Sequence, residues 1–107
     1  MQGNLKEKWA LVTGASSGLG VDFARRLAER GCNLILVARR EERLAGVREE
    51  IESEYGVEAR VMAMDLARDE APRELLDEVD KEGLPVDVLI NNAGFGMHGP
   101  FEEGDWE

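Results

Sequence analysis

The sequence has few of the features that would place it in an extracellular or membrane class. It contains a single cysteine, Cys32, so no disulfide can form within the chain. Disulfides are rare in reducing compartments, and we therefore expect a cytoplasmic protein. The longest apolar run near the N-terminus covers residues 9–12, which is too short for a secretory signal or a membrane span.

Positive charge is also scarce. Thirteen lysines and arginines stand against 23 aspartates and glutamates, a formal net charge of −10. A chain this acidic is repelled by phosphate polymers and by anionic lipid, so we expect no nucleic-acid partner and no membrane partner. The acidic excess lies in the second half, and the arginines of the first half can still bind one local anion.

What the sequence does contain is a regular alternation of strand and helix patterns. The segment 34–37 is continuously apolar, which is typical of a strand that is covered on both faces. Four strands are expected, at residues 9–13, 33–38, 58–63 and 86–91.

Between the strands, apolar residues recur at helical spacing, and we expect each set to pack on the sheet. A glycine closes each set, at Gly31, Gly56 and Gly83, where it allows the chain to leave the helix sharply. Asp69 is a candidate N-cap of the third helix, with Pro72 in its first turn. The three sets are Leu19, Phe23 and Leu27; Leu44, Val47 and Ile51; and Leu75, Leu76 and Val79.

The order β-α-β-α-β-α-β predicts an α/β fold with a doubly wound parallel sheet, because strands joined by helices of this length pair in parallel through right-handed crossovers. The sequence shows no linker or internal boundary, so residues 1–107 are expected to form one domain. Residues 92–107 are expected to be a loop that leads toward a further helix.

The turn from the first strand to the first helix carries the strongest functional signal. Its glycines, Gly14, Gly18 and Gly20, are spaced as in turns that bind a dinucleotide. Free amides at the helix start then bind the pyrophosphate. A P-loop is excluded because Val21, and not a lysine, follows the last glycine. The candidate binding residues are Gly14, Ser16, Ser17, Gly18, Leu19 and Gly20.

The same segment also matches G-x-S-x-G, the nucleophile turn of serine hydrolases, with Ser16 as the nucleophile. That turn normally follows several strands, and here only 13 residues precede Gly14. The one histidine, His98, lies in a glycine-rich segment. A hydrolase is therefore the weaker alternative.

The residue after the second strand indicates which coenzyme binds. An acid at this place binds the ribose hydroxyls of NAD, whereas an arginine accommodates the 2′-phosphate of NADP. The sequence has Arg39 here, which predicts NADP, with NAD as the alternative. Arg40 and Arg43 are expected only to solvate the following helix.

Three motifs in this order and spacing resemble those of the short-chain dehydrogenase/reductase family, and the resemblance extends from about Lys8 to Glu107. The motifs are Thr13 to Gly20, Asp65-Leu66, and Asn91-Asn92-Ala93-Gly94.

The resemblance implies a Rossmann-type fold with strand order 3-2-1-4. It also implies that Ser16 and the backbone around Leu19 face the phosphates, and that Asp65, followed by Leu66, accepts a hydrogen bond from the adenine amino group. The Asn92-Ala93-Gly94 backbone would lie along the adenosine ribose, and Asn91 would stabilise the strand crossing. A loop cap at Asp65 and a turn former at Asn91 are the simpler alternatives.

The sequence departs from the family at the catalytic residues, which are a Tyr-x-x-x-Lys pair, an upstream serine and an asparagine on a helix. The single tyrosine, Tyr55, is followed four residues later by Ala59. We identify no catalytic residue and no metal ligands, and we expect the 107 residues alone to be inactive. Ser17 stands where some NADP-using relatives carry a basic residue, so the NADP assignment depends mainly on Arg39.

The sequence thus predicts the NADP(H)-binding part of an oxidoreductase that acts on an unidentified carbonyl or alcohol. A dinucleotide-binding module without catalysis is the alternative. The fourth strand would present an unpaired edge, so we also expect a homo-oligomer that associates through it.

Overall fold

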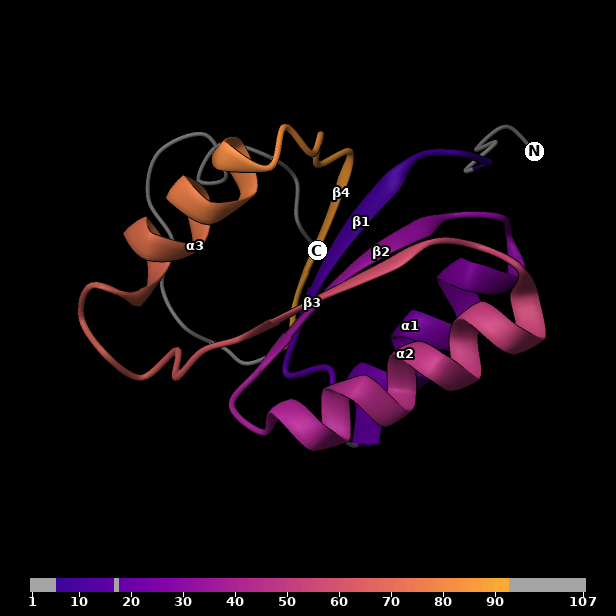
Figure 1. Ribbon diagram of the computed structural model, residues 1–107, viewed down its shortest axis with the longest axis horizontal. Coiled ribbons are helices and arrows are strands. Elements are labelled where there is room, and N and C mark those ends of the chain that lie inside the picture. The colour runs from indigo at the N-terminus through magenta and orange to yellow at the C-terminus, as the bar shows by residue number, and fades with distance from the viewer. Residues whose placement is uncertain (1–5, 17, 93–107) are drawn as a thin grey trace.

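The computed structural model describes residues 6–16 and 18–92 and confirms the alternation of strands and helices (Figure 1). Its elements are β1 (Trp9–Thr13), α1 (Gly18–Glu29), β2 (Asn33–Ala38), α2 (Glu41–Tyr55), β3 (Ala59–Ala63), α3 (Ala71–Lys81) and β4 (Val88–Asn91).

Two strands begin later than predicted, because side chains take over the hydrogen bonds at their starts. Before β3, the amide of Glu58 donates to Oδ1 of Asn33 at 2.9 Å. Before β4, the Asp87 carboxylate accepts from the amide of Trp9, also at 2.9 Å.

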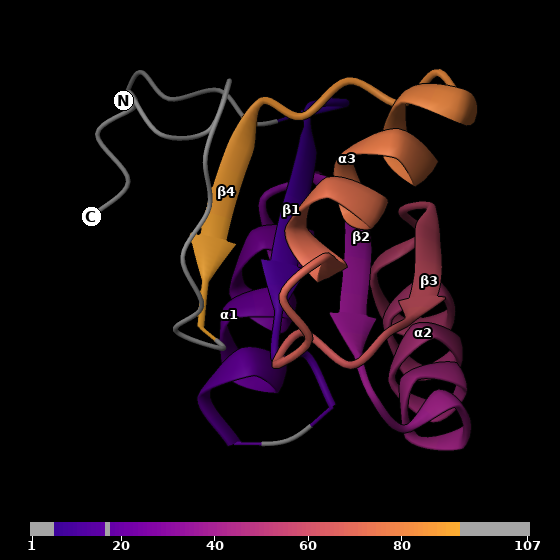
Figure 2. The ribbon, with the colours of Figure 1, turned by 90° about the vertical axis from the view of Figure 1, so that its left-hand side faces the viewer.

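The four strands form one parallel sheet in the order β3-β2-β1-β4, as predicted. Thr13, at the end of β1, pairs in register with Val37 of β2 on one side and with Asn91 of β4 on the other. Figure 2 shows α3 on one face of the sheet and α1 and α2 on the opposite face. Because every strand runs in the same direction, all four carboxyl ends meet at one edge.

The central strand β2 is covered on both faces, as its continuous apolar run predicted. Leu34 and Leu36 belong to the cluster beneath α1 and α2, whereas Ile35 and Val37 belong to the cluster beneath α3. All four side chains are 0% exposed. The sheet is therefore the middle of three layers.

The expected packing is confirmed for α2 and α3 and is partly wrong for α1. Leu19 is 64% exposed and does not join the core. The buried residues of α1 are small, namely Gly20, Ala24 and Ala28, while Phe23 and Leu27 are only partly buried. Small residues at this face let α1 lie close to the sheet, and they leave the first turn of the helix open.

The glycines that close the helices have the expected left-handed conformation, with φ of 87° at Gly31, 72° at Gly56 and 67° at Gly83. The start of α3 differs from the prediction, because the N-cap position is Glu70 and its side chain makes no capping bond. Asp69 is therefore not the cap.

The physical reason is a backbone turn that leads directly into α3. The amide of Ala71 donates to the carbonyl of Arg68 at 3.1 Å, so a helix-like bond already exists before the first turn. Pro72 lies in that first turn, as predicted, where its missing amide proton is not needed.

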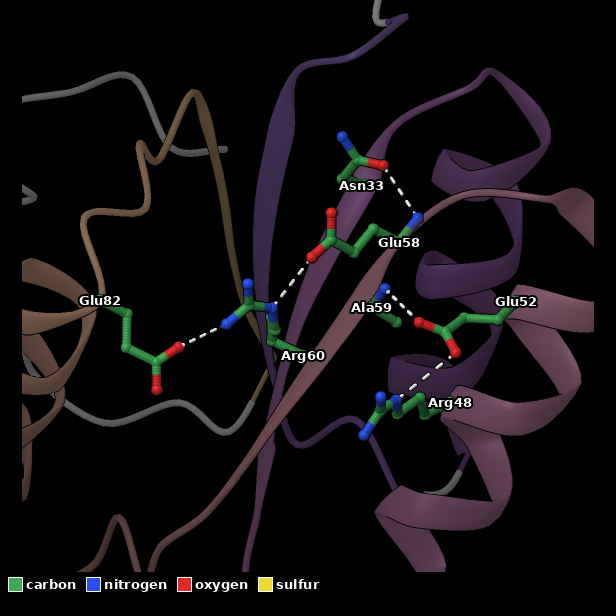
Figure 3. A network of polar contacts seen from close by, with 7 residues as sticks. All are labelled: Asn33, Arg48, Glu52, Glu58, Ala59, Arg60 and Glu82. Carbon is green, nitrogen blue, oxygen red and sulfur yellow. Dashed lines mark hydrogen bonds and ion pairs between the residues drawn. The ribbon is translucent and has the colours of Figure 1, made fainter.

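The edge strand β3 carries charged side chains that connect it to its neighbours (Figure 3). Arg60 donates to Glu58, just before the start of β3, at 3.0 Å and to Glu82, beyond the end of α3, at 2.8 Å. Charge on an edge strand discourages pairing with another chain. The β3 edge is thus protected by charge, and self-association through the β4 edge stays a prediction.

Glu52 of α2 makes a second connection to β3. One carboxylate oxygen accepts from the amide of Ala59 at 2.9 Å, and the other lies 3.5 Å from Nε of Arg48 (Figure 3). The helix α2 is thereby held to the start of the strand that follows it.

The single thiol is inaccessible. Cys32 is 0% exposed, and its Sγ lies 3.3 Å from the carbonyl oxygen of Lys8. Burial, with a smaller contribution from the Asp87 carboxylate, raises the pKa of the Cys32 thiol from 9.0 to about 11. The folded state therefore favours the neutral thiol, and the stability gained is present below pH 9 and is lost as the pH rises toward 11.

Since the thiolate is the reactive species, we expect Cys32 to resist a chromogenic disulfide reagent at pH 8 in the folded chain and to react fully in urea. The absorbance of the released thiolate measures both reactions, and a Cys32→Ala variant sets the baseline. Rapid reaction of the folded chain would contradict the buried position.

Candidate functional site

The candidate site lies at the carboxyl edge of the sheet, where the segments that follow the four strands come together (Figure 2). The loop between β1 and α1 carries the glycines, and Arg39 follows β2 directly. Asp65 follows β3, and Asn92 follows β4. Ligands of doubly wound sheets bind at this edge, at the point where the strand order reverses, which here is between β1 and β4.

The glycine loop is held by hydrogen bonds to the strands on either side of β1. The amide of Ala15 donates to the carbonyl of Val37, in β2, at 3.1 Å. On the other side, Nδ2 of Asn92 donates to the carbonyl of Gly14 at 3.3 Å. The resemblance implied a role for the backbone of Asn92, and the structure adds this side-chain contact, which follows from the parallel neighbourhood of β1 and β4.

The backbone geometry explains why glycine occupies all three positions of the motif. Gly14 and Gly18 have positive φ, 65° and 57°, which favours glycine over other residues. A Cβ on Gly20 would lie 1.8 Å from the carbonyl oxygen of Gly14, so only glycine fits where the helix meets the loop. A Cβ on Gly18 would meet nothing within 4 Å, so the positive φ and not a lack of space favours glycine at this position.

The N-terminus of α1 is accessible to an anion. Gly18 and Leu19 are exposed, and the first turn contains no acidic residue. The amides of a first helical turn have no partner within the helix and attract negative charge. The exposure of Leu19, which contradicts its expected packing, is therefore compatible with its expected backbone role beside the phosphates.

The ends of β1 and β4 are joined by a partly buried polar pair. The hydroxyl of Thr13, which is 0% exposed, lies 3.1 Å from Oδ1 of Asn91 and 3.4 Å from the carbonyl of Ile90. This contact joins the last residue of β4 to the last residue of β1. It agrees with the stabilising role that the resemblance implied, and it holds the strand end next to the glycine loop in place.

Uncompensated positive charge also lies at this edge. Arg39 and Arg40 are exposed, and within residues 6–16 and 18–92 neither pairs with a carboxylate. Five other arginines of the same residues do form ion pairs, and these are Arg25, Arg26, Arg48, Arg60 and Arg68. The available guanidinium after β2 can therefore bind an anion.

Arg43 differs from its expected role of solvating α2. Its Nη1 lies 3.5 Å from the carbonyl oxygen of Ser16, so the side chain extends from the first turn of α2 to the glycine loop. The only hint in the sequence is that Arg43 lies in the first turn of a helix that begins at the same sheet edge as the loop, and hydrophobic spacing does not reveal such a contact.

Asp65 and Leu66 follow β3 and differ in their surroundings. Oδ1 of Asp65 accepts from the amide of Ala67 at 3.0 Å, which is the loop-capping alternative. A carboxylate has further acceptor positions, so this bond leaves room for an adenine amino group. Leu66 is 8% exposed and packs in the cluster beneath α3, which anchors the loop.

Some predicted residues lie outside the described part of the chain. They are Ser17, Ala93, Gly94 and His98. Residues 6–16 and 18–92 contain no histidine, and in them no group of three or more histidine, cysteine or acidic side chains could hold a metal. Within the same residues, no helix has the length and apolar character needed to cross a bilayer.

The residues at this edge are compatible with a bound dinucleotide. A side chain at position 20 would collide with Gly14, and among the described residues Arg39 has no carboxylate partner. The amides of the first helical turn can bind a pyrophosphate, and the guanidinium of Arg39 can bind a further anion. No described residue at the edge is placed as a general acid.

Comparison with known proteins agrees with this geometry. The sequence profile of the short chain dehydrogenase family matches residues 8–107. The chain is 44% identical over 92 residues to the very-long-chain 3-oxoacyl-CoA reductase of Kluyveromyces lactis. That match covers 86% of this chain and 27% of the relative, so the chain spans less than a third of the relative's length.

Solved structures show the same fold. The L-sorbose reductase of Gluconobacter frateurii, complexed with NADPH and L-sorbose, matches 97% of this chain and 40% of its own with a TM-score of 0.80 and 32% identity. A xylitol dehydrogenase bound to NAD⁺ matches 85% of this chain and 35% of its own with a TM-score of 0.76 and 36% identity. The fold therefore accommodates either coenzyme, and by its sequence and its structure the chain belongs to the short chain dehydrogenase family.

Proposed function

We propose that the chain forms the NADP(H)-binding part of an oxidoreductase that transfers hydride between the nicotinamide and a carbonyl or alcohol. The observation that supports it most is Arg39, which follows β2 at the same sheet edge as the glycine loop and has no carboxylate partner among the described residues. An acidic residue at this place would repel a 2′-phosphate, whereas a guanidinium binds it. The bound coenzyme would supply the hydride.

Different residues of the chain would bind different parts of the coenzyme. The first-turn amides of α1, beside Gly18, would bind the pyrophosphate, and Arg39 would bind the 2′-phosphate. Asp65 would accept from the adenine amino group, and Asn92 would hold the loop at Gly14. We assign no general acid, since the described residues include no tyrosine and lysine in the family's spacing, and we infer that residues 1–107 bind coenzyme without turnover.

Calorimetric titration with NADPH and NADH tests the proposal. We expect NADPH to bind more tightly, and we expect Arg39→Ala to narrow the difference by about 1–3 kcal/mol, the usual effect of losing a charge-assisted hydrogen bond. Arg30→Ala is the control, because this exposed arginine follows α1 at the opposite edge of the sheet and its loss changes the net charge equally.

If Arg39→Ala leaves the preference unchanged, Arg39 does not contact the 2′-phosphate. If the wild-type chain binds neither coenzyme, the dinucleotide site itself is wrong.

The substrate is assigned by class only. The relatives are named as reductases of a 3-oxoacyl-CoA and of L-sorbose, and both substrates offer a carbonyl group. A non-catalytic dinucleotide-binding module is the alternative, and it predicts the same titration without hydride transfer. Labelling of Ser16 by a fluorophosphonate would instead favour the hydrolase.

A further inference from the structure

The strongest feature that the proposed function does not use is the contact between Arg43 and the glycine loop. Nη1 of Arg43 lies 3.5 Å from the carbonyl oxygen of Ser16, across 27 positions of sequence. The side chain is exposed, so the contact is not forced by core packing. It brings a second guanidinium to the loop at which the dinucleotide is proposed to bind.

The backbone around Arg43 is fixed by core packing and by a helix hydrogen bond. The next residue, Leu44, is 0% exposed and belongs to the core beneath α1 and α2. The amide of Leu44 also donates to the carbonyl of Arg40 at 3.1 Å. The first turn of α2 is thus fixed in rotation, with Arg43 on the side of the loop.

Arg43 and Arg39 lie at the same corner of the sheet edge. The residue before Ser16, Ala15, donates to the carbonyl of Val37, and Arg39 follows Val37 by two positions. The loop carbonyl that Arg43 contacts is therefore next to the end of the strand that Arg39 follows.

The present partner of Arg43 is weak. A neutral carbonyl at 3.5 Å uses one of the five donors of a guanidinium, and among the described residues Arg43 has no carboxylate partner. A phosphate monoester carries up to two negative charges and accepts shorter, stronger bonds from arginine. A phosphate at this corner would therefore be a better partner for Arg43 than the Ser16 carbonyl.

We propose that Arg43 is a second specificity-determining residue, which binds the 2′-phosphate of the coenzyme together with Arg39 and is held ready by the Ser16 carbonyl. The inference rests on the proposed NADP(H) site. It states that Arg43 binds the phosphate and does not merely support the loop. Loss of a loop support would weaken the binding of every ligand, whereas loss of a phosphate contact would spare ligands that lack the phosphate.

The test compares two pairs of ligands that differ in the 2′-phosphate, namely NADPH with NADH and 2′,5′-ADP with 5′-AMP. We expect Arg43→Ala to weaken the binding of NADPH and of 2′,5′-ADP about ten-fold, while the affinities for NADH and 5′-AMP change less than two-fold. Arg43→Lys should recover part of the loss, since it keeps the charge and loses the planar fork. Circular dichroism and thermal melting confirm that each variant is folded.

Arg40→Ala is the matched control, because it removes the same charge from an exposed residue three positions away that has no ion pair among the described residues. It should change every affinity less than two-fold. An equal loss of affinity for all four ligands in the Arg43→Ala variant would show that Arg43 supports the loop, and it would overturn the inference.

The test also separates this inference from the proposed function. If the wild-type chain prefers 2′,5′-ADP, and Arg39→Ala abolishes that preference while Arg43→Ala retains it, only the role of Arg43 is wrong. If the wild-type chain shows no preference for either phosphorylated ligand, both the proposed NADP(H) site and this inference are wrong.

Discussion

Replacement of Gly20 by alanine is expected to lower the free energy of unfolding by about 3 kcal/mol or more, at the upper end of the usual effect of overpacking. The added Cβ would lie 1.8 Å from the carbonyl oxygen and 2.7 Å from the carbonyl carbon of Gly14. Both are backbone atoms, so no flexible side chain can move aside. The helix α1 would have to leave the loop, and coenzyme binding should be lost with it. Urea unfolding, followed by circular dichroism, measures the change.

Gly46→Ala is the matched control within the same chain. Gly46 lies inside α2, and a Cβ there would meet nothing within 4 Å. Alanine should raise the free energy of unfolding by about 0.5–1 kcal/mol, because glycine is a poor helix former. If both variants changed stability in the same direction and by the same amount, the close approach between Gly20 and Gly14 would be wrong.

The second large effect is expected at Leu75, at the interface of α3 with the sheet. Among the described residues, α3 is the one helix on that face (Figure 2), and Leu75 is 0% exposed in the cluster beneath it. Leu75→Ala should lower the free energy of unfolding by about 3 kcal/mol, because truncation removes buried apolar surface and leaves a cavity.

Leu76→Ala provides the comparison, since it removes the same atoms from the neighbouring position of the same helix. Leu76 is only partly buried, so its truncation should cost about 1 kcal/mol. Equal losses at the two positions would mean that α3 is rotated relative to the sheet. Urea midpoints and slopes of both variants, measured side by side, decide between these outcomes.

The candidate site also has an electrostatic setting of its own. The chain carries a net charge of −10, which disfavours the approach of an anionic coenzyme over long distances. The arginines near the loop act over contact distances, where their effect exceeds that of distant carboxylates screened by salt. Binding strength at this site therefore depends on a few contacts and not on the overall charge.

The architecture could be predicted because it depends on periodic features. The continuous run at residues 34–37 indicated a strand covered on both faces, and the structure buries all four side chains. The glycines at the helix ends were predictable for a local reason, since a left-handed conformation is restricted mainly to glycine. The glycine loop followed from its place between a strand and a helix, while the strand order came from the family resemblance.

The predictions were wrong where the outcome depends on the position of a helix relative to the sheet, or where two different local structures can satisfy the start of a helix. Leu19 has the right spacing for the core, but α1 begins beyond the sheet edge and leaves it exposed. Asp69 is a good capping residue by type, but a backbone turn already satisfies the start of α3.

The amino-acid sequence by itself determined the class of fold, the position of the glycine loop and the basic residue after β2, because hydrophobic period, glycine conformation and charge are properties of short segments. Only the tertiary structure decided that the Asn92 side chain holds Gly14 and that Arg43 reaches Ser16. These contacts depend on how parallel strands and the first turn of α2 are arranged at one edge, and that arrangement results from the packing of the whole sheet.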